Sequence, residues 1–352
     1  MKFQPRCLPT AIGSLPHIDA NQACRIVFEN LKEIPAWPQL PKRTYFENMY
    51  VQYTEGMPCL VLDLKKERLY FNTADKDKLV DEASIFYSYY IKHDLDKFAI
   101  SDFYANGLHH FLELLDELPE APVAIKGQVT GPISFSLTVT DEHKKPILYN
   151  LMLFDIIVRT LARKAEWQER KFKEILPGVR TIIFFDEPYL MAYGSAFISL
   201  GREQCISSLS EVVSACSGLT GVHCCGRTDW TLFSECGVDI ISFDAYKYID
   251  NLALYPVQVK EFLDRGGILA WGIVPSTLPA IERVDVDILA KKFEECVQLL
   301  EKKGIDRETL IENALITPSC GVTSLPVELA EKAYQLTKAL SERLRKRYYK
   351  SD

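Results

Sequence analysis

The chain has 352 residues, of which 47% are hydrophobic and 25% are charged, and its formal net charge at pH 7 is −7. These values are typical of a folded globular protein and exclude collagen-like, low-complexity and wholly disordered chains. They also argue against a nucleic-acid binder, because such proteins usually carry a basic excess or stripe. One dense basic run, at the C-terminus, is predicted to be a last helical turn whose charge complements the helix dipole: Arg343, Arg345, Lys346, Arg347 and Lys350.

Short apolar or β-branched runs recur along the chain, and each ends in small or polar residues. They predict eight strands: Thr10–Gly13, Cys59–Leu62, Val123–Lys126, Thr181–Phe185, Gly221–Cys225, Val238–Phe243, Ile268–Ala270 and Ala314–Thr317. Segments with apolar residues at helical spacing lie between most of them. They predict six helices, the first with Asp19 as its N-cap: Ala20–Leu31, Leu148–Ile175, Ser207–Ser217, Val257–Leu263, Leu289–Leu300 and Pro326–Tyr349.

This alternation predicts an α/β fold, a single (β/α)8 TIM barrel that spans residues 1–352. The segment between Asp63 and Val123 is too long for one unit, so we expect extra helices between the early strands. A doubly wound sheet is the alternative, but no G-x-G-x-x-G motif opens a helix. A barrel carries its active site at the C-terminal ends of its strands, which is where the chemically useful residues of this sequence lie.

No stretch reaches the ~18–20 apolar residues that span a bilayer, and the first residues lack the apolar core of a signal peptide. We therefore predict a cytoplasmic protein with no membrane partner. Its ten cysteines are then expected to be free thiols or metal ligands rather than a disulfide framework.

Three metal-ligating side chains occupy predicted strand ends. His223 and Cys225 are two residues apart on one strand, so both face one side while Cys224 faces the other. Cys320, in the turn after the last strand, is the best-placed third ligand. One imidazole and two thiolates suit zinc, and an exchangeable fourth position, for which Asp244 is the candidate, is typical of a catalytic zinc site. Core packing is the alternative interpretation of the His-x-Cys pair taken alone.

Candidate substrate-binding residues follow other predicted strands. Asp186 and Glu187 are adjacent carboxylates, which are costly to bury unless paired, so one of them is predicted to hold a substrate cation such as an amino group. A helix N-terminus ahead of Pro188 is the structural alternative. Ser14 and Gln128 lie in predicted glycine-containing turns, where a ligand can approach the backbone. Ordinary strand–helix turns would look the same.

Together these segments resemble the C-terminal catalytic domain of cobalamin-independent methionine synthase, in the superfamily that includes uroporphyrinogen decarboxylase. The matching segments occur in the family's order and span nearly the whole chain: Thr10–Pro16, Lys126-Gly127 with Thr130–Pro132, Asp186–Pro188, His223 with Cys225, and Pro318–Gly321. The resemblance implies a barrel with a catalytic zinc ion on His223, Cys225 and Cys320. Asp244 takes the place of the family's fourth ligand, a glutamate.

The resemblance also implies a reaction, the transfer of a methyl group to a thiol acceptor of the homocysteine kind to give methionine. Ser14 and Asp186 match the residues that grip the amino-acid part of homocysteine. A zinc-bound thiol loses its proton at neutral pH and becomes nucleophilic. Asp244 would leave the metal as the substrate sulfur arrives, so Asp186 and Asp244 are the candidate catalytic residues.

Three features depart from the family. The sequence shows no N-terminal barrel that helps to hold a folate, and Thr138 stands where the family has a tryptophan that stacks on the pterin. The family's acidic segment that contacts homocysteine is only loosely matched by Tyr45–Met49. The donor is therefore either methyltetrahydrofolate or a methylcorrinoid carried by a partner protein, and we expect the methylcorrinoid to be the better donor.

Three other functions remain as alternatives. A uroporphyrinogen decarboxylase-like enzyme needs no metal but relies on an arginine-rich N-terminal motif, of which Arg6 alone is present. A barrel glycosidase could use Asp186 and Asp244 as its two carboxylates, but this would leave the histidine and cysteines unexplained. A non-catalytic zinc- or corrinoid-binding barrel would hold its metal with ligands that never exchange.

Overall fold

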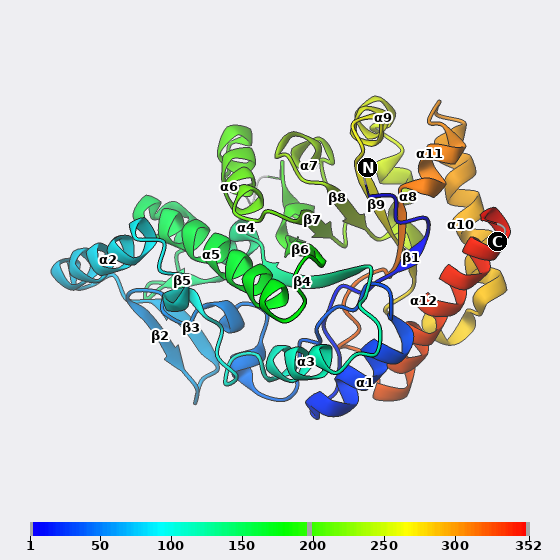
Figure 1. Cartoon of the computed structure of the whole chain (residues 1–352). Helices are drawn as coiled ribbons and strands as arrows, with labels where there is room; N and C mark the ends of the chain where they lie inside the picture. Colours follow the sequence, from blue (N-terminus) through cyan, green and yellow to red (C-terminus); the bar gives the residue numbers. More distant parts are fainter. Residues whose placement is uncertain (1–2, 196–198, 350–352) are drawn as a thin grey trace.

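The computed structural model describes residues 3–195 and 199–349 of the chain, and its centre is a parallel sheet of seven strands that curls into a half-barrel (Figure 1). The strands follow the order β1-β10-β9-β8-β7-β6-β4. Their bounds are β1 Leu8–Pro9, β4 Ala124–Thr130, β6 Arg180–Asp186, β7 Leu219–Cys224, β8 Ile240–Phe243, β9 Ile268–Val274 and β10 Ala314–Pro318. Six of the eight predicted strands are therefore confirmed as members of this sheet, with shifted ends. The first predicted strand, Thr10–Gly13, lies directly after β1 and shares no residue with it, although the Thr10 N–H still donates to Ile316 O at 3.0 Å.

The second predicted strand, Cys59–Leu62, does not belong to this sheet. It forms β2 (Leu60–Asp63), which pairs antiparallel with β3 (Arg68–Phe71), and β3 pairs with β5 (Thr140–Asp141) in a separate small sheet. All four residues of β2 are only partly buried, whereas strands inside an α/β barrel are covered on both faces. Strand β2 pairs with β3, which follows it closely in the sequence, because a short turn after Asp63 reverses the chain and forms a β-hairpin.

Residues 33–39 lie between the two edges of the curled sheet instead. Backbone hydrogen bonds join them to β4 and to the segment after β1: Ala124 N–H to Glu33 O, Lys126 N–H to Pro35 O, Trp37 N–H to Lys126 O, Leu15 N–H to Gln39 O and Gln39 N–H to Gly13 O. The sequence did not reveal this strand-like segment because Pro35 and Pro38 interrupt it. Proline lacks the N–H that a central strand donates, so its presence argues against a strand.

Helices such as α5, α10 and α12 cover the outer face of the sheet (Figure 1). The twelve α-helices of the described residues are α1 Ala20–Asn30, α2 Lys76–Ile91, α3 Asn106–Asp116, α4 Pro132–Thr138, α5 Leu151–Ile175, α6 Arg202–Ser214, α7 Thr231–Glu235, α8 Ala245–Leu252, α9 Pro256–Asp264, α10 Val286–Glu301, α11 Arg307–Glu312 and α12 Val327–Tyr348. All six predicted helices are confirmed, and α2 and α3 are the extra helices expected early in the chain. Asp19 caps α1 by accepting the Asn21 and Gln22 N–H groups.

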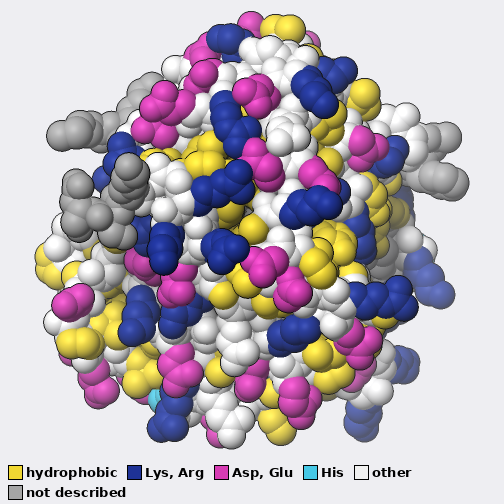
Figure 2. Space-filling view, turned by 90° about the vertical axis from the view of Figure 1, so that its right-hand side faces the viewer, with side chains coloured by type: hydrophobic (Ala, Val, Ile, Leu, Met, Phe, Trp, Pro, Cys, Tyr) yellow, Lys and Arg dark blue, Asp and Glu magenta, His cyan; other side chains and the backbone are white. Residues whose placement is uncertain are grey.

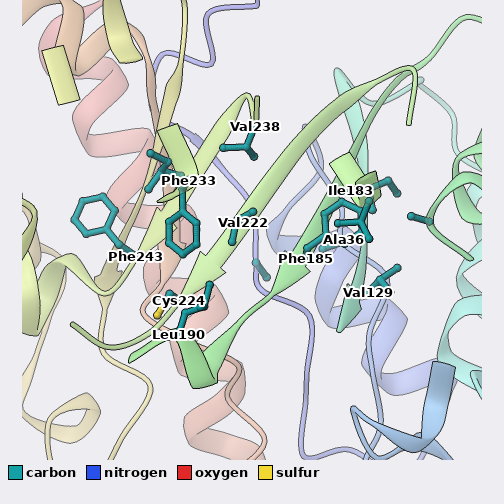
Figure 3. Packing of buried hydrophobic residues seen from close by; sticks show 14 of the residues in the cluster. Ala36, Val129, Ile183, Phe185, Leu190, Val222, Cys224, Phe233, Val238 and Phe243 are labelled. Carbon is teal, nitrogen blue, oxygen red and sulfur yellow. The ribbon is translucent and has the colours of Figure 1, made fainter. Parts of the chain in front are cut away.

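The strands bury side chains on both faces. Ile182 and Phe184 of β6 point into the curl of the sheet, whereas the alternate residues Ile183 and Phe185 face the helices, with Val129 nearby (Figure 3). Figure 3 also shows Val222 and Cys224 of β7 in this outer layer, together with Phe233 and Phe243. Cys224 therefore faces away from the interior, as predicted from strand alternation.

Oppositely charged side chains intermingle on the face formed by the C-terminal helices (Figure 2). The basic residues at the end of α12 form ion pairs with acidic partners on other segments: Arg343 with Asp287, Arg345 with Glu33, and Arg347 with Glu294. Lys350, the last member of the predicted basic run, lies outside the described residues. Within the described residues, no helix combines the length and the apolar character that a membrane crossing requires.

Candidate metal and substrate site

His223, Cys225 and Cys320 meet at the C-terminal end of the curled sheet. His223 lies on β7, Cys225 follows that strand directly, and Cys320 lies in the turn after β10. One ligand atom from each residue lies within 4.8 Å of the other two. The predicted convergence of these three side chains is therefore confirmed, and we call them the His–Cys–Cys cluster.

Glycine allows the turn that carries Cys320 to approach the turn that carries Ser14. A Cβ atom on Gly321 would lie 1.9 Å from Ser14 Oγ, so any larger residue would displace the Ser14 hydroxyl from its position. The contact is fixed by a backbone hydrogen bond of 2.9 Å from the Val322 N–H to the Ser14 carbonyl. Ser14 is thereby held beside the His–Cys–Cys cluster, in the same cavity.

The donor atoms of the cluster suit a soft metal ion. Nε2 of His223 is buried without a hydrogen-bond partner among the described residues, while Nδ1 lies 2.9 Å from the Ser242 hydroxyl. A hydrogen bond from Cys320 lowers the pKa of Cys225, and His223 lowers it further. The same contact between the two thiols raises the pKa of Cys320. One nitrogen lone pair and a thiol pair that favours an anion are the ligands that zinc prefers.

The cluster opens into a cavity of about 330 Å³. Its walls are apolar at Ile12, Pro41, Met49 and Pro188, and polar at Ser14, Glu47, Asn48 and Asp186. A small cavity with apolar walls and a few convergent polar groups is typical of a small-molecule site. The residues come from four different strand ends and from the segment after residues 33–39, which is the arrangement expected of a barrel-type active site.

Two buried carboxylates in this cavity each leave one oxygen unpaired. Asp186 Oδ1 and Glu47 Oε2 have no hydrogen-bond partner among the described residues, although Arg43 donates to the other oxygen of Glu47 at 2.7 Å. Burial raises the pKa of both groups, and the charges of His223 and Lys126 oppose the rise at Asp186. Unpaired buried acceptors of this kind call for a cationic donor, because leaving them unpaired is costly.

Comparison with known proteins identifies relatives of one kind. No protein-family model matches the sequence. A methionine synthase from Methanocaldococcus jannaschii is 23% identical over 217 residues, which is 59% of this chain and 61% of that protein. The match therefore spans less than two thirds of the relative's length.

Two solved structures share the fold. A B12-independent methionine synthase from Shewanella sp. W3-18-1, in complex with selenomethionine, has a TM-score of 0.59 at 15% identity over 97% of this chain and 98% of that one. A methyltransferase from Methanosarcina mazei has a TM-score of 0.54 at 14% identity over 95% and 87% of the two chains. The chain is thus similar to a methionine synthase in sequence over the matched residues, and similar to a B12-independent methionine synthase in fold. The resemblance to the cobalamin-independent enzyme is therefore confirmed.

Glu187 lies outside the cavity. Its buried carboxylate accepts the Ile133 and Ser134 N–H groups at 2.9 and 2.8 Å and the Ser134 hydroxyl at 2.6 Å. These are the first N–H groups of α4, which have no partner within their own helix. The structure thus gives Glu187 a capping position at α4, not at the short helix that begins at Pro188, where its side chain makes no capping hydrogen bond, and Asp186 alone of the pair lines the cavity.

Gln128 also lies outside the cavity, because the predicted turn around it is wrong. Strand β4 continues to Thr130, so the Gln128 side chain points into the interior below Gly13. Its amide donates to Trp37 O at 2.9 Å and accepts from Lys126 Nζ at 3.2 Å. Gly13 has a φ of +142°, and a Cβ there would lie 2.7 Å from the Gln128 amide. Gln128 therefore supports the turn that leads to Ser14.

Asp244 is close to the His–Cys–Cys cluster but is not a member of it. One carboxylate oxygen caps α8 by accepting the Lys247 N–H at 2.8 Å. Burial raises the pKa of Asp244 to about 6, and Cys225 and His223 are near enough for their charges to act on it. The predicted candidate for an exchangeable ligand thus lies beside the cluster with one oxygen already engaged.

Proposed function

We propose that this protein is a zinc-dependent methyltransferase that methylates the sulfur of a small amino-acid thiol such as homocysteine, giving methionine. The observation that carries the proposal is the His–Cys–Cys cluster beside two unpaired carboxylate oxygens in one cavity. The cluster supplies a place for a thiol, and the carboxylates supply a place for an amino group. The similarity to methionine synthase and to a methyltransferase supports the same class of reaction.

His223, Cys225 and Cys320 would hold the zinc ion. The fit rests on the buried, unpaired Nε2 of His223 and on a thiol pair that already favours an anion. Bound zinc would lower the pKa of a coordinated thiol and so keep its sulfur nucleophilic at neutral pH. We further propose that Asp244 serves as an exchangeable fourth ligand, which its place directly after β8, the strand that pairs with the strand of His223, supports.

Asp186 and Glu47 would bind the ammonium group of the acceptor, with Ser14 at the same wall of the cavity. Charge-assisted hydrogen bonds from an ammonium group would satisfy both unpaired oxygens. The two ends of the acceptor would then be fixed, its amino group at the carboxylates and its sulfur at the metal. Its lone pair forms the new sulfur–carbon bond, the donor keeps the electron pair of the broken bond, and the thiol proton passes to solvent.

The donor would reach the sulfur from outside the cavity. A volume of about 330 Å³ lies at the small end of the range for ligand pockets, so neither a pterin nor a corrin ring would enter the cavity together with the acceptor. Thr138 carries no flat ring, and its hydroxyl donates to Ser134 O at 2.8 Å instead of facing a ligand. We therefore propose a methylcorrinoid on a partner protein as the donor, with methyltetrahydrofolate as the alternative.

Two further proposals concern the fold around the site and the domain organisation of the chain. Residues 33–39 would complete an eight-stranded barrel, which their hydrogen bonds to both sheet edges support. The whole chain would then act as one catalytic domain. All ten cysteines are free thiols, which suits a cytoplasmic enzyme.

The test is a methylation assay with zinc-loaded protein. The acceptors are homocysteine and, for comparison, simple thiols without an amino group, and the product is identified by mass spectrometry. We expect methionine from homocysteine, and no product when a chelator has removed the metal. Bound zinc without product from any donor or acceptor would contradict the proposal and favour a non-catalytic zinc-binding barrel.

A further inference from the structure

The imidazole of His223 is held from the neighbouring strand. His223 of β7 and Ser242 of β8 are register partners, and Ser242 Oγ lies 2.9 Å from His223 Nδ1. Both side chains are buried, with exposed fractions of 3% for His223 and 0% for Ser242. Because parallel strands keep a fixed register, this contact depends on the backbone of the sheet rather than on a flexible loop.

A hydroxyl in this position needs an explanation. Ser242 follows the inward-facing Ile240 at strand spacing, so its side chain enters an interior that is otherwise largely apolar. Burying a hydroxyl there costs free energy unless it forms a hydrogen bond. Among the residues that the structure describes, the ring of His223 is the one partner recorded for Ser242 Oγ.

The chemistry of imidazole gives this hydrogen bond a direction. A neutral imidazole carries its proton on one nitrogen and a lone pair on the other. If Nε2 is to offer its lone pair to a metal, the proton must reside on Nδ1, and a buried N–H needs an acceptor. Ser242 Oγ lies where it could be that acceptor, and Nε2, which has no partner among the described residues, would be the nitrogen left for the metal.

We infer that Ser242 is a positioning residue for the metal centre, because it accepts the Nδ1–H of His223 and fixes the ring with Nε2 toward Cys225 and Cys320. The inference rests on the proposed function, since it gives His223 the role of a zinc ligand. Ser242 itself touches neither metal nor substrate. Its effect on catalysis is exerted through the affinity and the geometry of the metal site.

The test measures zinc affinity of the full-length protein by competition with a chromophoric chelator. Residues behind a ligating histidine typically contribute about 10- to 100-fold to metal affinity. We expect Ser242→Ala to weaken zinc binding by this factor. Ser341→Ala is the matched control, because Ser341 is also buried and donates to Cys7 O at 2.7 Å, far from the site. We expect the control to bind zinc like the wild type.

A double-mutant cycle separates positioning from general damage to the fold. In the background of His223→Ala, Ser242→Ala should cause no further loss of the residual zinc affinity, because the hydrogen bond is already absent. Three results would overturn this inference and leave the proposed function standing. They are wild-type zinc affinity in Ser242→Ala, an equal loss of zinc affinity in Ser341→Ala, and an additive loss of zinc affinity in the double variant. A wild-type protein that binds no zinc would overturn the proposed function and this inference together.

Discussion

Asp186 and His223 are register partners on neighbouring strands β6 and β7. Each leaves one buried polar atom, Oδ1 of Asp186 and Nε2 of His223, without a partner among the described residues. The backbone pairing of two strands thus sets the spacing between the group that would bind the substrate's amino end and the group that would bind the metal. In the proposed reaction, a small amino-acid thiol would reach from the carboxylate of Asp186 to the metal held by His223, and the register of the two strands therefore connects the fold with the proposed reaction.

The first prediction concerns the ligand that is most distant along the chain from the other two. Cys320→Ala should lower zinc content by roughly tenfold or more, because two remaining ligands cannot hold the ion in a tetrahedral site. Metal analysis of purified protein measures the effect. Cys224→Ala is the matched control, since that thiol is adjacent to the cluster in sequence but packs in the outer core layer. Unchanged zinc content in Cys320→Ala would count against Cys320 as a ligand.

The second prediction tests Glu47 as an ammonium site. Glu47→Gln removes the negative charge but keeps the shape, so it should raise KM for homocysteine by about 10- to 100-fold, the value of a charge-assisted hydrogen bond of roughly 1.5–3 kcal/mol. A thiol acceptor without the amino group serves as the control and should be methylated equally well by both proteins. An equal loss with both acceptors would point to damage at the metal site instead.

Most of the fold could be predicted from the sequence because its signals are local. Apolar runs and helical spacing located six strands of the central sheet and all six predicted helices. The error at Cys59–Leu62 arose because a short apolar run looks the same in a barrel and in a hairpin. Residues 33–39 were missed because the two prolines in this segment conceal its strand-like hydrogen bonds, which depend on partners distant in sequence.

The candidate site could be predicted from the sequence where its side chains follow the two-residue repeat of a β-strand. His223 and Cys225 face one side because they are two residues apart, and Cys320 was located by its place after the last strand. Glu47 was recognised only as part of a loosely matching segment, because its burial depends on how the segment after residues 33–39 folds over the cavity. Gln128 was misplaced because β4 runs further than its apolar core suggests.

The third prediction ranks the methyl donors. With homocysteine as acceptor, methylcobalamin should support a higher rate than methyltetrahydrofolate, because Thr138 offers no surface on which a pterin could stack. Initial rates of methionine formation at equal donor concentrations measure this. The zinc-depleted protein is the control for uncatalysed transfer from each donor. A higher rate with the folate would require a pterin site that the proposal does not include.

The fourth prediction concerns the pH dependence of stability and is independent of the metal. Lys164 on α5 is fully buried and donates from Nζ to Ala99 O at 3.1 Å. Burial lowers the pKa of Lys164 from 10.5 to about 8, and the charge of Glu55 offsets part of this. Between about pH 8 and 10.5 the unfolded chain therefore holds more protons at this residue than the folded chain. The contribution of Lys164 to the free energy of unfolding should rise with pH across this window.

Lys164→Met keeps most of the side-chain volume and removes the titrating group. The free energy of unfolding of the wild type minus that of the variant should increase with pH, by at most about 1.4 kcal/mol per pH unit between pH 8 and 10.5. Urea titrations at several pH values measure the difference, in which the other titrating groups cancel. Lys291→Met, at a side chain that is 81% exposed, is the control for losing a lysine charge. A difference that stays constant with pH would show that Lys164 remains charged in the folded protein.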